Sequence, residues 1–199
     1  MLKMRFLTAV AIFLTLLHAD TTDEKIKKQL QEPQTTPPLI QAIGEKEYKK
    51  ALNEGVYKYV GNTKCRLCHR EFFIGRKKDK HDFAFKSLVE KGYENEPKCL
   101  VCHTTGYGIA YGFESIEETP RLANVQCEGC HGPGSKHIKI ARRTKKGGGF
   151  LVSPTDPETQ KKICFACHTK IWNGSYHKKD FEKVYKLYRN PDPNKQNSR

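Results

Sequence analysis

Several kinds of residue are scarce in this 199-residue chain, and each scarcity limits what the chain can be. The two methionines, Met1 and Met4, stand at its start, so the rest of the chain has no methionine side chain. Only 37% of the residues are hydrophobic and the mean hydropathy is -0.72, a thin apolar supply for a core of this length. The apolar run at 6–17 is too short for a membrane-spanning helix.

No cysteine is left over either, because all eight belong to four copies of one pattern, C-x-x-C-H. The copies span 65–69, 99–103, 127–131 and 164–168. Their cysteines stand one helical turn apart, so both sulfurs can form thioethers with the two vinyl groups of one porphyrin. The histidine that follows can then bind the iron as its proximal ligand. Zinc binding would not explain why a histidine follows the second cysteine in every copy, and disulfide bonding would not explain it either.

The pattern therefore predicts four covalently bound haem c groups. The thioether cysteines would be Cys65, Cys68, Cys99, Cys102, Cys127, Cys130, Cys164 and Cys167. The proximal iron ligands would be His69, His103, His131 and His168.

Few residues remain to bind the opposite side of each iron. Apart from the motif histidines and His18 near the start, the chain has only His81, His137 and His177, which we take as distal ligands. Without a methionine beyond Met4, His–Met coordination is excluded, so the six-coordinate haems should be bis-His and of low potential. At least one of four haems must then be pentacoordinate, or bind water, Lys, Tyr, the N-terminal amine or a histidine of another chain.

The predicted fold is a mostly α multihaem cytochrome c with little sheet, in which the haem cluster forms the core and the apo-chain is largely unfolded. Helices are expected at 65–73, 77–91 and 136–146, and around the fourth motif after a capping box at 155–158. Asn62 or Thr63 and Ser135 are the expected N-caps of two of them. The glycine-rich stretch 104–113 is expected to be a loop or short hairpin over a haem, and 177–189 a last helix.

The N-terminal segment of the chain suggests export. Residues 1–19 have a basic start, an apolar run and Ala19 before a polar segment, as a secretory signal peptide does. Haem attachment of this type takes place outside the cytoplasmic membrane, so we expect a periplasmic protein, with a retained membrane anchor as the alternative. The expected domains are the signal peptide 1–19, a polar, solvated N-terminal arm 20–55, a tetrahaem cytochrome c domain 56–189 and a disordered tail 190–199.

The formal net charge of +14 bears on the partner. A basic, exported redox protein is expected to dock on a redox protein with an acidic surface, or on an anionic membrane surface. Nucleic acid is a poor candidate, because the lysines are scattered and the compartment is wrong.

Some segments also resemble a known family. The stretch 127–137, Cys-Glu-Gly-Cys-His-Gly-Pro-Gly-Ser-Lys-His, is similar to the C-E-x-C-H-G-P-G motif of the tetrahaem cytochrome c-554 family, which is related to the electron acceptor of hydroxylamine oxidoreductase. The segments 60–69, 80–85, 99–108 and 164–168 resemble that family too. The fourth segment is shorter here than in the family, and the N-terminal extension has no clear counterpart there.

The resemblance implies a mostly helical fold with haems in closely stacked pairs. It assigns His137 to the first haem, His81 to the third and His177 to the fourth. The second haem, bound through His103, would be the pentacoordinate one.

Two functions follow as hypotheses. The first is a periplasmic tetrahaem electron carrier that serves a larger redox enzyme, for which the resemblance suggests nitrogen-oxide metabolism. The second is an enzyme that reduces nitric oxide or another small nitrogen oxide at the second haem, with Thr104, Thr105 and Tyr107 as candidate pocket residues. The carrier is preferred, and no residue is assigned a catalytic role, because the spare histidines serve better as iron ligands than as proton donors.

Overall fold

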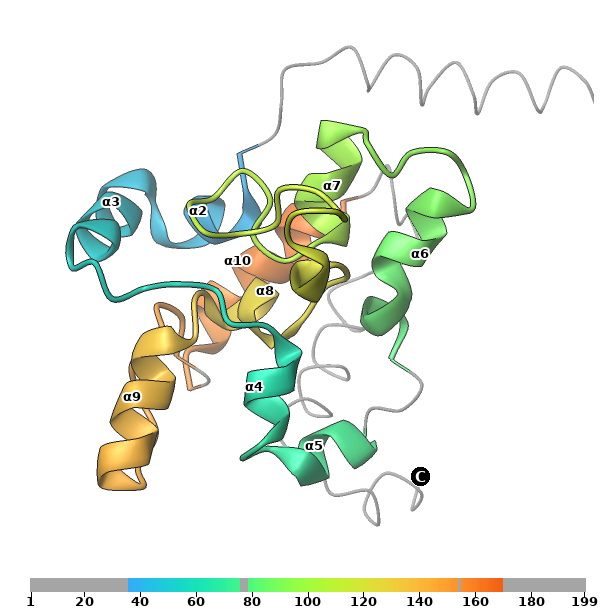
Figure 1. Cartoon of the computed structure of the whole chain (residues 1–199). Coiled ribbons are helices and arrows are strands. Elements are labelled where there is room, and N and C mark those ends of the chain that lie inside the picture. The colour runs from blue at the N-terminus through green and yellow to red at the C-terminus, as the bar shows by residue number, and fades with distance from the viewer. Residues whose placement is uncertain (1–35, 76–78, 154, 170–199) are drawn as a thin grey trace, which may run out of the picture. The chain divides into compact units, whose positions relative to one another are not determined.

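The computed structural model describes residues 36–75, 79–153 and 155–169 (Figure 1). Over these ranges the chain is helical and forms no strand, and its only bridge pairs Thr104 with Ala123. The predicted mostly α class with little sheet is therefore confirmed. The expected signal peptide, the helix at 177–189 and the tail lie outside the described residues.

Eleven helices are present in the described part of the chain. They are α2 (Pro38–Ile43), α3 (Glu45–Asn53), α4 (Asn62–Arg66), α5 (Arg70–Gly75), the 3-10 helix η1 (Lys80–Phe83), α6 (Ala84–Val89), α7 (Pro97–His103), the 3-10 helix η2 (Pro120–Leu122), α8 (Cys127–His131), α9 (Ser135–Thr144) and α10 (Pro157–Cys167). None of them is long and apolar enough to cross a lipid bilayer.

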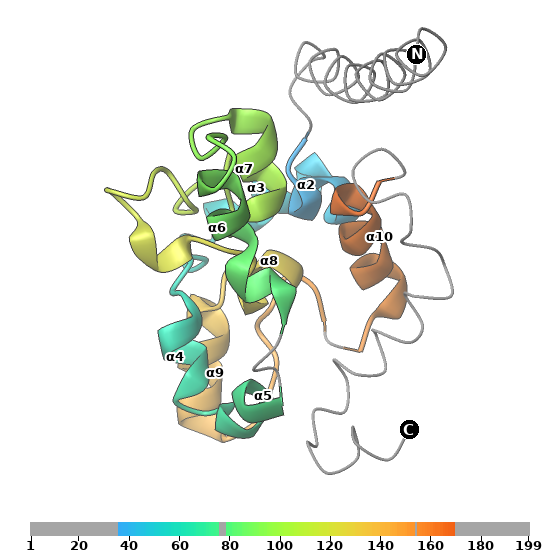
Figure 2. The same ribbon diagram turned by 90° about the vertical axis from the view of Figure 1, so that its right-hand side faces the viewer.

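Helices α2 and α3 correct the expectation of a solvated arm for residues 36–53. Leu39 and Tyr48 are only 2% and 6% exposed, and α2 packs along α10 (Figures 1 and 2). The Tyr48 hydroxyl accepts a hydrogen bond of 3.1 Å from the Ala110 N–H and so ties α3 to the glycine-rich stretch. The mostly apolar α2 buries Leu39 and Ala42, and the polar α3 buries Tyr48 and Ala51 at helical spacing, so a thin apolar stripe is enough to attach α3 to the domain.

An apolar core of side chains accompanies the helices. Phe85 of α6 packs on Phe113 with ring centroids 5.6 Å apart, and Leu122 is fully buried. The cluster also contains Leu39, Ala42, Tyr48, Tyr59, Leu88, Leu100, Ile109, Ala123, Val152 and Ile163. Burial of each large side chain contributes about 1.5–3 kcal/mol, so side chains provide a core of their own.

The glycine-rich stretch after the second motif forms a loop, as predicted. Its ends meet where the Phe113 N–H donates to the Thr105 carbonyl at 3.0 Å. Inside the loop, a Cβ on Gly112 would lie 1.8 Å from the carbonyl oxygen of Gly106. Only glycine fits this close approach of two backbone segments.

Two predicted helices are shorter than expected. The helix expected at 65–73 is interrupted after α4 and resumes as α5 at Arg70. The helix expected at 77–91 consists of η1 and α6, and the Asp79 side chain caps it by accepting from the His81 N–H at 2.9 Å. In both places a histidine predicted to bind iron lies at or beside a helix end.

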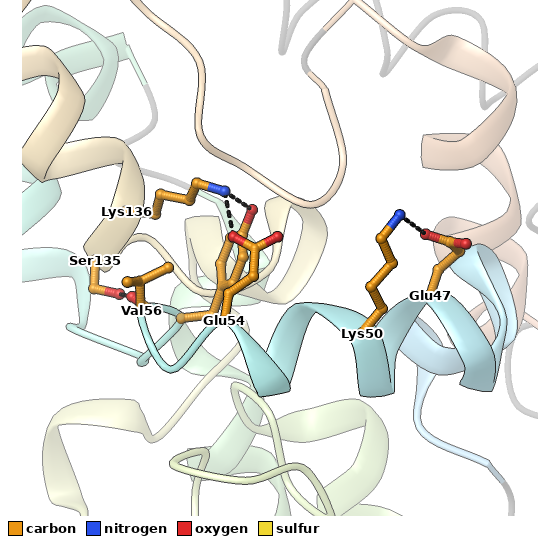
Figure 3. Close-up of polar contacts among 7 residues, drawn as sticks. Glu47, Lys50, Glu54, Val56, Ser135 and Lys136 are labelled. Carbon is orange, nitrogen blue, oxygen red and sulfur yellow. Dashed lines mark hydrogen bonds and ion pairs between the residues drawn. The ribbon is translucent and has the colours of Figure 1, made fainter.

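The predicted N-caps are also corrected. Gly61, rather than Asn62 or Thr63, precedes α4, and Gly134 precedes α9. Ser135 instead donates its hydroxyl to the Val56 carbonyl and accepts from the Lys58 N–H at 2.7 Å (Figure 3). At α10 the cap is Asp156, which accepts from the Thr159 N–H at 3.0 Å, with Pro157 in the first turn.

Candidate haem centre

One large cavity brings the four motifs together. Its volume is about 1590 Å³, whereas a pocket for one small ligand usually holds roughly 300–1,000 Å³. Its lining includes the motif residues Cys65, Cys68, His69, Cys102, His103, Cys127, Cys130, His131, Cys164, Cys167 and His168, together with His81 and His137. Cys99 is the one motif cysteine absent from this lining, and His177 lies outside the described residues.

Each motif lies at a helix end, where one turn fixes the spacing of its side chains. Helix α8 is the third motif itself, and α7 and α10 end in the second and fourth motifs. In the first motif the His69 N–H donates to the Cys65 carbonyl at 3.0 Å, and in the fourth the His168 N–H donates to the Cys164 carbonyl at 2.8 Å. These bonds place cysteine and histidine on the same side of the backbone.

The cysteines form no disulfide with one another. Among the described residues no three Cys, His, Asp or Glu side chains are gathered as the ligands of one metal ion, so the structure lends no support to the zinc alternative. Burial raises the pKa of the Cys99 and Cys164 thiols to about 11, which keeps them protonated at neutral pH.

Thiols from different motifs adjoin. A hydrogen bond with Cys127 and burial raise the pKa of Cys65, which joins the first motif to the third. A hydrogen bond to Cys102 and burial raise the pKa of Cys167, which joins the second motif to the fourth. The third motif also adjoins the fourth, because Cys130 adds to the rise in the pKa of Cys167.

Two motif histidines are oriented by backbone carbonyls. The Nδ1 of His103 lies 2.8 Å from the Ala84 carbonyl, and the Nδ1 of His131 lies 3.3 Å from the Val152 carbonyl. Since a carbonyl oxygen can only accept, Nδ1 carries the proton and Nε2 keeps its lone pair. This second contact of the ring is typical of metal-binding histidines.

The two distal candidates within the described residues have the same arrangement. The Nδ1 of His137 lies 2.8 Å from the Gly148 carbonyl, and the Nδ1 of His81 lies 3.2 Å from the Asp79 carboxylate. Both contacts put the proton on Nδ1 and so leave the lone pair on Nε2, the atom that would bind a metal. These partners could not be foreseen from the sequence.

Burial also favours the neutral imidazole that a metal requires. It lowers the pKa of His131, and it lowers the pKa values of His69 and His168, where the nearby His137 and His81 add to the effect. Neutral imidazole rings are suited to iron and poorly suited to charged pairing.

Two histidine pairs stand out. The rings of His69 and His137 have centroids 6.0 Å apart and planes inclined by 28°, and those of His81 and His168 are 5.9 Å apart at 77°. Two imidazoles that bind one metal through nitrogens at about 2.0–2.1 Å would have centroids roughly 6 Å apart. The first pair is the one that the family resemblance implies. In the second pair His81 lies beside His168, whereas the resemblance assigns His81 to the third haem.

Two motif histidines have no such partner. Among the described residues neither the His103 ring nor the His131 ring contacts another histidine ring, and His131 lies beside Phe150 instead. The Nδ1 side of His103 is closed by α6. The candidate pocket hydroxyls are occupied, since Thr104 Oγ1 donates to the Leu100 carbonyl at 2.7 Å and Thr105 Oγ1 to the Asn124 carbonyl at 2.8 Å. Of the three candidates, only Tyr107 lines the cavity without a hydroxyl committed to such a bond.

Sequence reasoning assigned no role to Glu128, which is 1% exposed. Its carboxylate accepts from the N–H groups of Val60 at 3.0 Å, Gly61 at 2.7 Å and Gly134 at 2.6 Å. Burial raises the pKa of this carboxyl, and the three backbone donors oppose that shift. Glu128 thus fastens the segment before the first motif to the turn after the third.

Comparison with known proteins agrees with this site. The family model "Cytochrome c554 and c-prime" matches residues 64–132. Cytochrome c-554 of Nitrosomonas europaea is 29% identical over 147 residues, which cover 59% of this chain and 62% of that protein. Multiheme cytochrome MtrA of Shewanella baltica is 30% identical over 104 residues, 46% of this chain and 31% of that protein. No solved structure matches.

The helical fold, the motifs in one cavity and these matches define a multihaem c-type cytochrome with covalently bound haem c. Through residues 64–132 the chain is similar to the cytochrome c554 family, which confirms the predicted resemblance. The chain spans less than two thirds of the length of either relative.

Proposed function

We propose that this chain is a periplasmic tetrahaem cytochrome that carries electrons to or from a larger redox enzyme. The observation that carries the proposal is the single cavity lined by residues of all four C-x-x-C-H motifs. Haem c, when bound there, supplies a reversible one-electron iron couple. The rest of the chemistry is positioning by the protein.

The cysteines and histidines of the motifs divide that work. Eight cysteines fix the porphyrins through thioethers, and His69, His103, His131 and His168 bind iron on the proximal side. His81, His137 and His177 are the distal ligands. Support comes from the two ring pairs and from the Nδ1 contacts, which hold each ring in the tautomer that leaves Nε2 free.

The arrangement of the thiols supports transfer between sites. The hydrogen-bonded pairs Cys65–Cys127 and Cys102–Cys167 bring the attachment points of two motifs into contact in each case. Closely placed attachment points suit a carrier that passes electrons within itself before it meets its partner.

The cellular setting is part of the proposal. The apolar run behind a basic start suits export, residues 20–35 then form the remaining polar arm, and 190–199 a tail. We expect the partner to be a redox protein with an acidic docking surface, with nitrogen-oxide metabolism as the setting that the resemblance suggests. A retained membrane anchor is the alternative to a cleaved signal.

One observation favours the second candidate function, reduction of a small nitrogen oxide at the second haem. Like His131, His103 contacts no other histidine ring among the described residues, which suits an open iron, and the family resemblance assigns the open site to His103. The hydroxyls of Thr104 and Thr105 argue against this enzyme function, because both already donate to backbone carbonyls and cannot readily donate to a ligand. Turnover of nitric oxide by the reduced protein alone would establish the enzyme.

The haem content tests the proposal. The full precursor is produced in a bacterial host that attaches haem in its periplasm, and the haem per chain is measured by pyridine haemochrome absorbance and intact mass. We expect four covalent haems, recovered in the periplasmic fraction, and three when Cys164 and Cys167 are both replaced by Ala. A chain that carries none, or whose mass shows bound zinc instead, would contradict the proposal.

A further inference from the structure

Helix α9 has two parts with different charge relations. Near its start, Lys136 Nζ lies 2.6 Å from the Glu54 carboxylate and 3.0 Å from the Tyr57 hydroxyl (Figure 3). Beyond Lys136, none of the cations on or just after this helix pairs with an acidic residue of the described part of the chain. These are Lys139, Arg142, Arg143, Lys145 and Lys146, and all five are exposed.

Helix α9 differs in this respect from α3. Two of the three exposed lysines of α3 face acids of the same helix, with Lys49 at 2.7 Å from Glu45 and Lys50 at 3.9 Å from Glu47. Helix α9 has no acidic residue at all. Like charges so close together repel one another, so the binding of an anionic surface would stabilise them.

These cations surround the first motif. Arg142, Lys145 and Lys146 line the same cavity as His69 and His137. Lys64 of α4 lines it too, is exposed, and adds a sixth cation from the other side. We call these six residues the cationic face.

The first motif is also the most open to solvent. His69 is exposed, whereas His103, His131 and His168 are half-buried. Its neighbour Leu67 is 71% exposed. A haem carries only two propionates, too few to balance six cations, so most of the positive charge remains for a partner.

We propose that the cationic face is the docking surface for an acidic redox protein, and that electrons enter or leave at the first motif. This inference rests on the proposed carrier function. A protein partner is favoured over a membrane for two reasons. Cationic residues line the cavity that holds the predicted haem motifs. Helix α9 also exposes no large apolar side chain that could insert into lipid. Oppositely charged surfaces raise association rates by 10-fold to 1,000-fold at low salt.

The test uses two cations that do not line the cavity. Lys139→Glu with Arg143→Glu reverses charge at i and i+4 of α9, and the matched control, Lys46→Glu with Lys50→Glu, does the same on α3. Both are made in the haem-loaded protein. The donors are photoreduced flavodoxin, an acidic protein, and the semiquinone of lumiflavin, a small neutral molecule.

At low ionic strength the α9 variant should be reduced by flavodoxin about tenfold more slowly than the parent, and the α3 control within about twofold of it. Added salt should bring the three rates together. Lumiflavin should reduce all three proteins alike. If charge reversal impairs folding, Lys139→Gln with Arg143→Gln should still slow flavodoxin by about threefold.

If flavodoxin reduced the α9 and α3 variants equally slowly, the proposed location of the docking surface would be wrong, because the rate would then depend only on the net charge of the protein. An unchanged flavodoxin rate in the α9 variant would overturn this location too, as would loss of binding to phosphatidylglycerol vesicles with the flavodoxin rate intact. Failure of the carrier function is distinguishable, because the parent protein would then carry no haem or accept electrons from neither donor.

Discussion

The carboxylate of Glu128, in the third motif, accepts a 2.7 Å hydrogen bond from the N–H of Gly61, which precedes the first motif. The same carboxylate accepts from Val60 and Gly134, so one buried side chain satisfies backbone donors on two segments. Because both segments lead into or out of predicted attachment sites, this contact sets how the first and third motifs lie relative to each other.

Replacement of Glu128 by Gln should weaken the domain. An amide offers one acceptor oxygen in place of two, so at least one backbone N–H loses its partner and the NH₂ group faces another donor. The expected loss is about 2–4 kcal/mol, measured as a lower thermal midpoint of the haem-loaded protein. Exposed Glu118 is the control, and a Glu128→Gln midpoint equal to that of Glu118→Gln would contradict this role.

Glycine 112 offers a second stability test. A methyl group at this position would lie 1.8 Å from the Gly106 carbonyl oxygen, so Gly112→Ala must move one of two backbone segments. Gly147→Ala is the matched control, because nothing lies within 4 Å of the added atom there. We expect the first change to lower stability by more than about 2 kcal/mol and the second by under about 1 kcal/mol. Similar midpoints for the two variants would show that the loop is not so closely packed.

Asp79 should tune the iron that His81 binds. A carboxylate on Nδ1 makes the ring a stronger donor and stabilises oxidised iron. Asp79→Asn removes the charge but keeps an oxygen for the helix cap, so one midpoint potential should rise by roughly tens of millivolts in a potentiometric titration, where 59 mV is a tenfold change. Glu118→Gln, an exposed position that does not line the cavity, is the control. A titration curve that coincides with the parent's would refute this influence.

His137 is expected to complete the coordination of the iron that His69 binds. His137→Ala should convert one low-spin haem into a high-spin one without loss of covalent haem, because the cysteines stay in place. The absorbance and EPR spectra of the oxidised variant report this change. Lys139→Ala on the same helix should leave both spectra unaltered, and an unaltered spectrum in His137→Ala would exclude it as a ligand.

The motifs were readable from sequence because their chemistry is local. Cysteine, cysteine and histidine must occupy one helical turn to serve one porphyrin, so the spacing itself carries the information. Cavity lining, ring pairs and helical class agree with that interpretation. The occupied hydroxyls of Thr104 and Thr105 were not foreseeable, because their acceptors depend on the fold of the loop.

Long-range contacts explain what the sequence did not reveal. The carbonyl that orients His131 belongs to Val152, 21 residues away, and the donors to Glu128 lie up to 68 residues away. Ser135 has the composition of an N-cap, yet its hydroxyl is used by the 56–58 segment instead. The attachment of α2 to α10 was missed because α2 is only six residues long and begins at Pro38, directly after Pro37, a pattern typical of a linker.

We infer that four haems are bound and that the coordination of one of them differs from that of the rest. The decisive measurement is EPR of the oxidised protein, together with a count of its haems. We expect four covalent haems per chain, with one high-spin signal from the site of His103 beside low-spin bis-histidine signals. Four low-spin haems, or fewer than four haems, would contradict it.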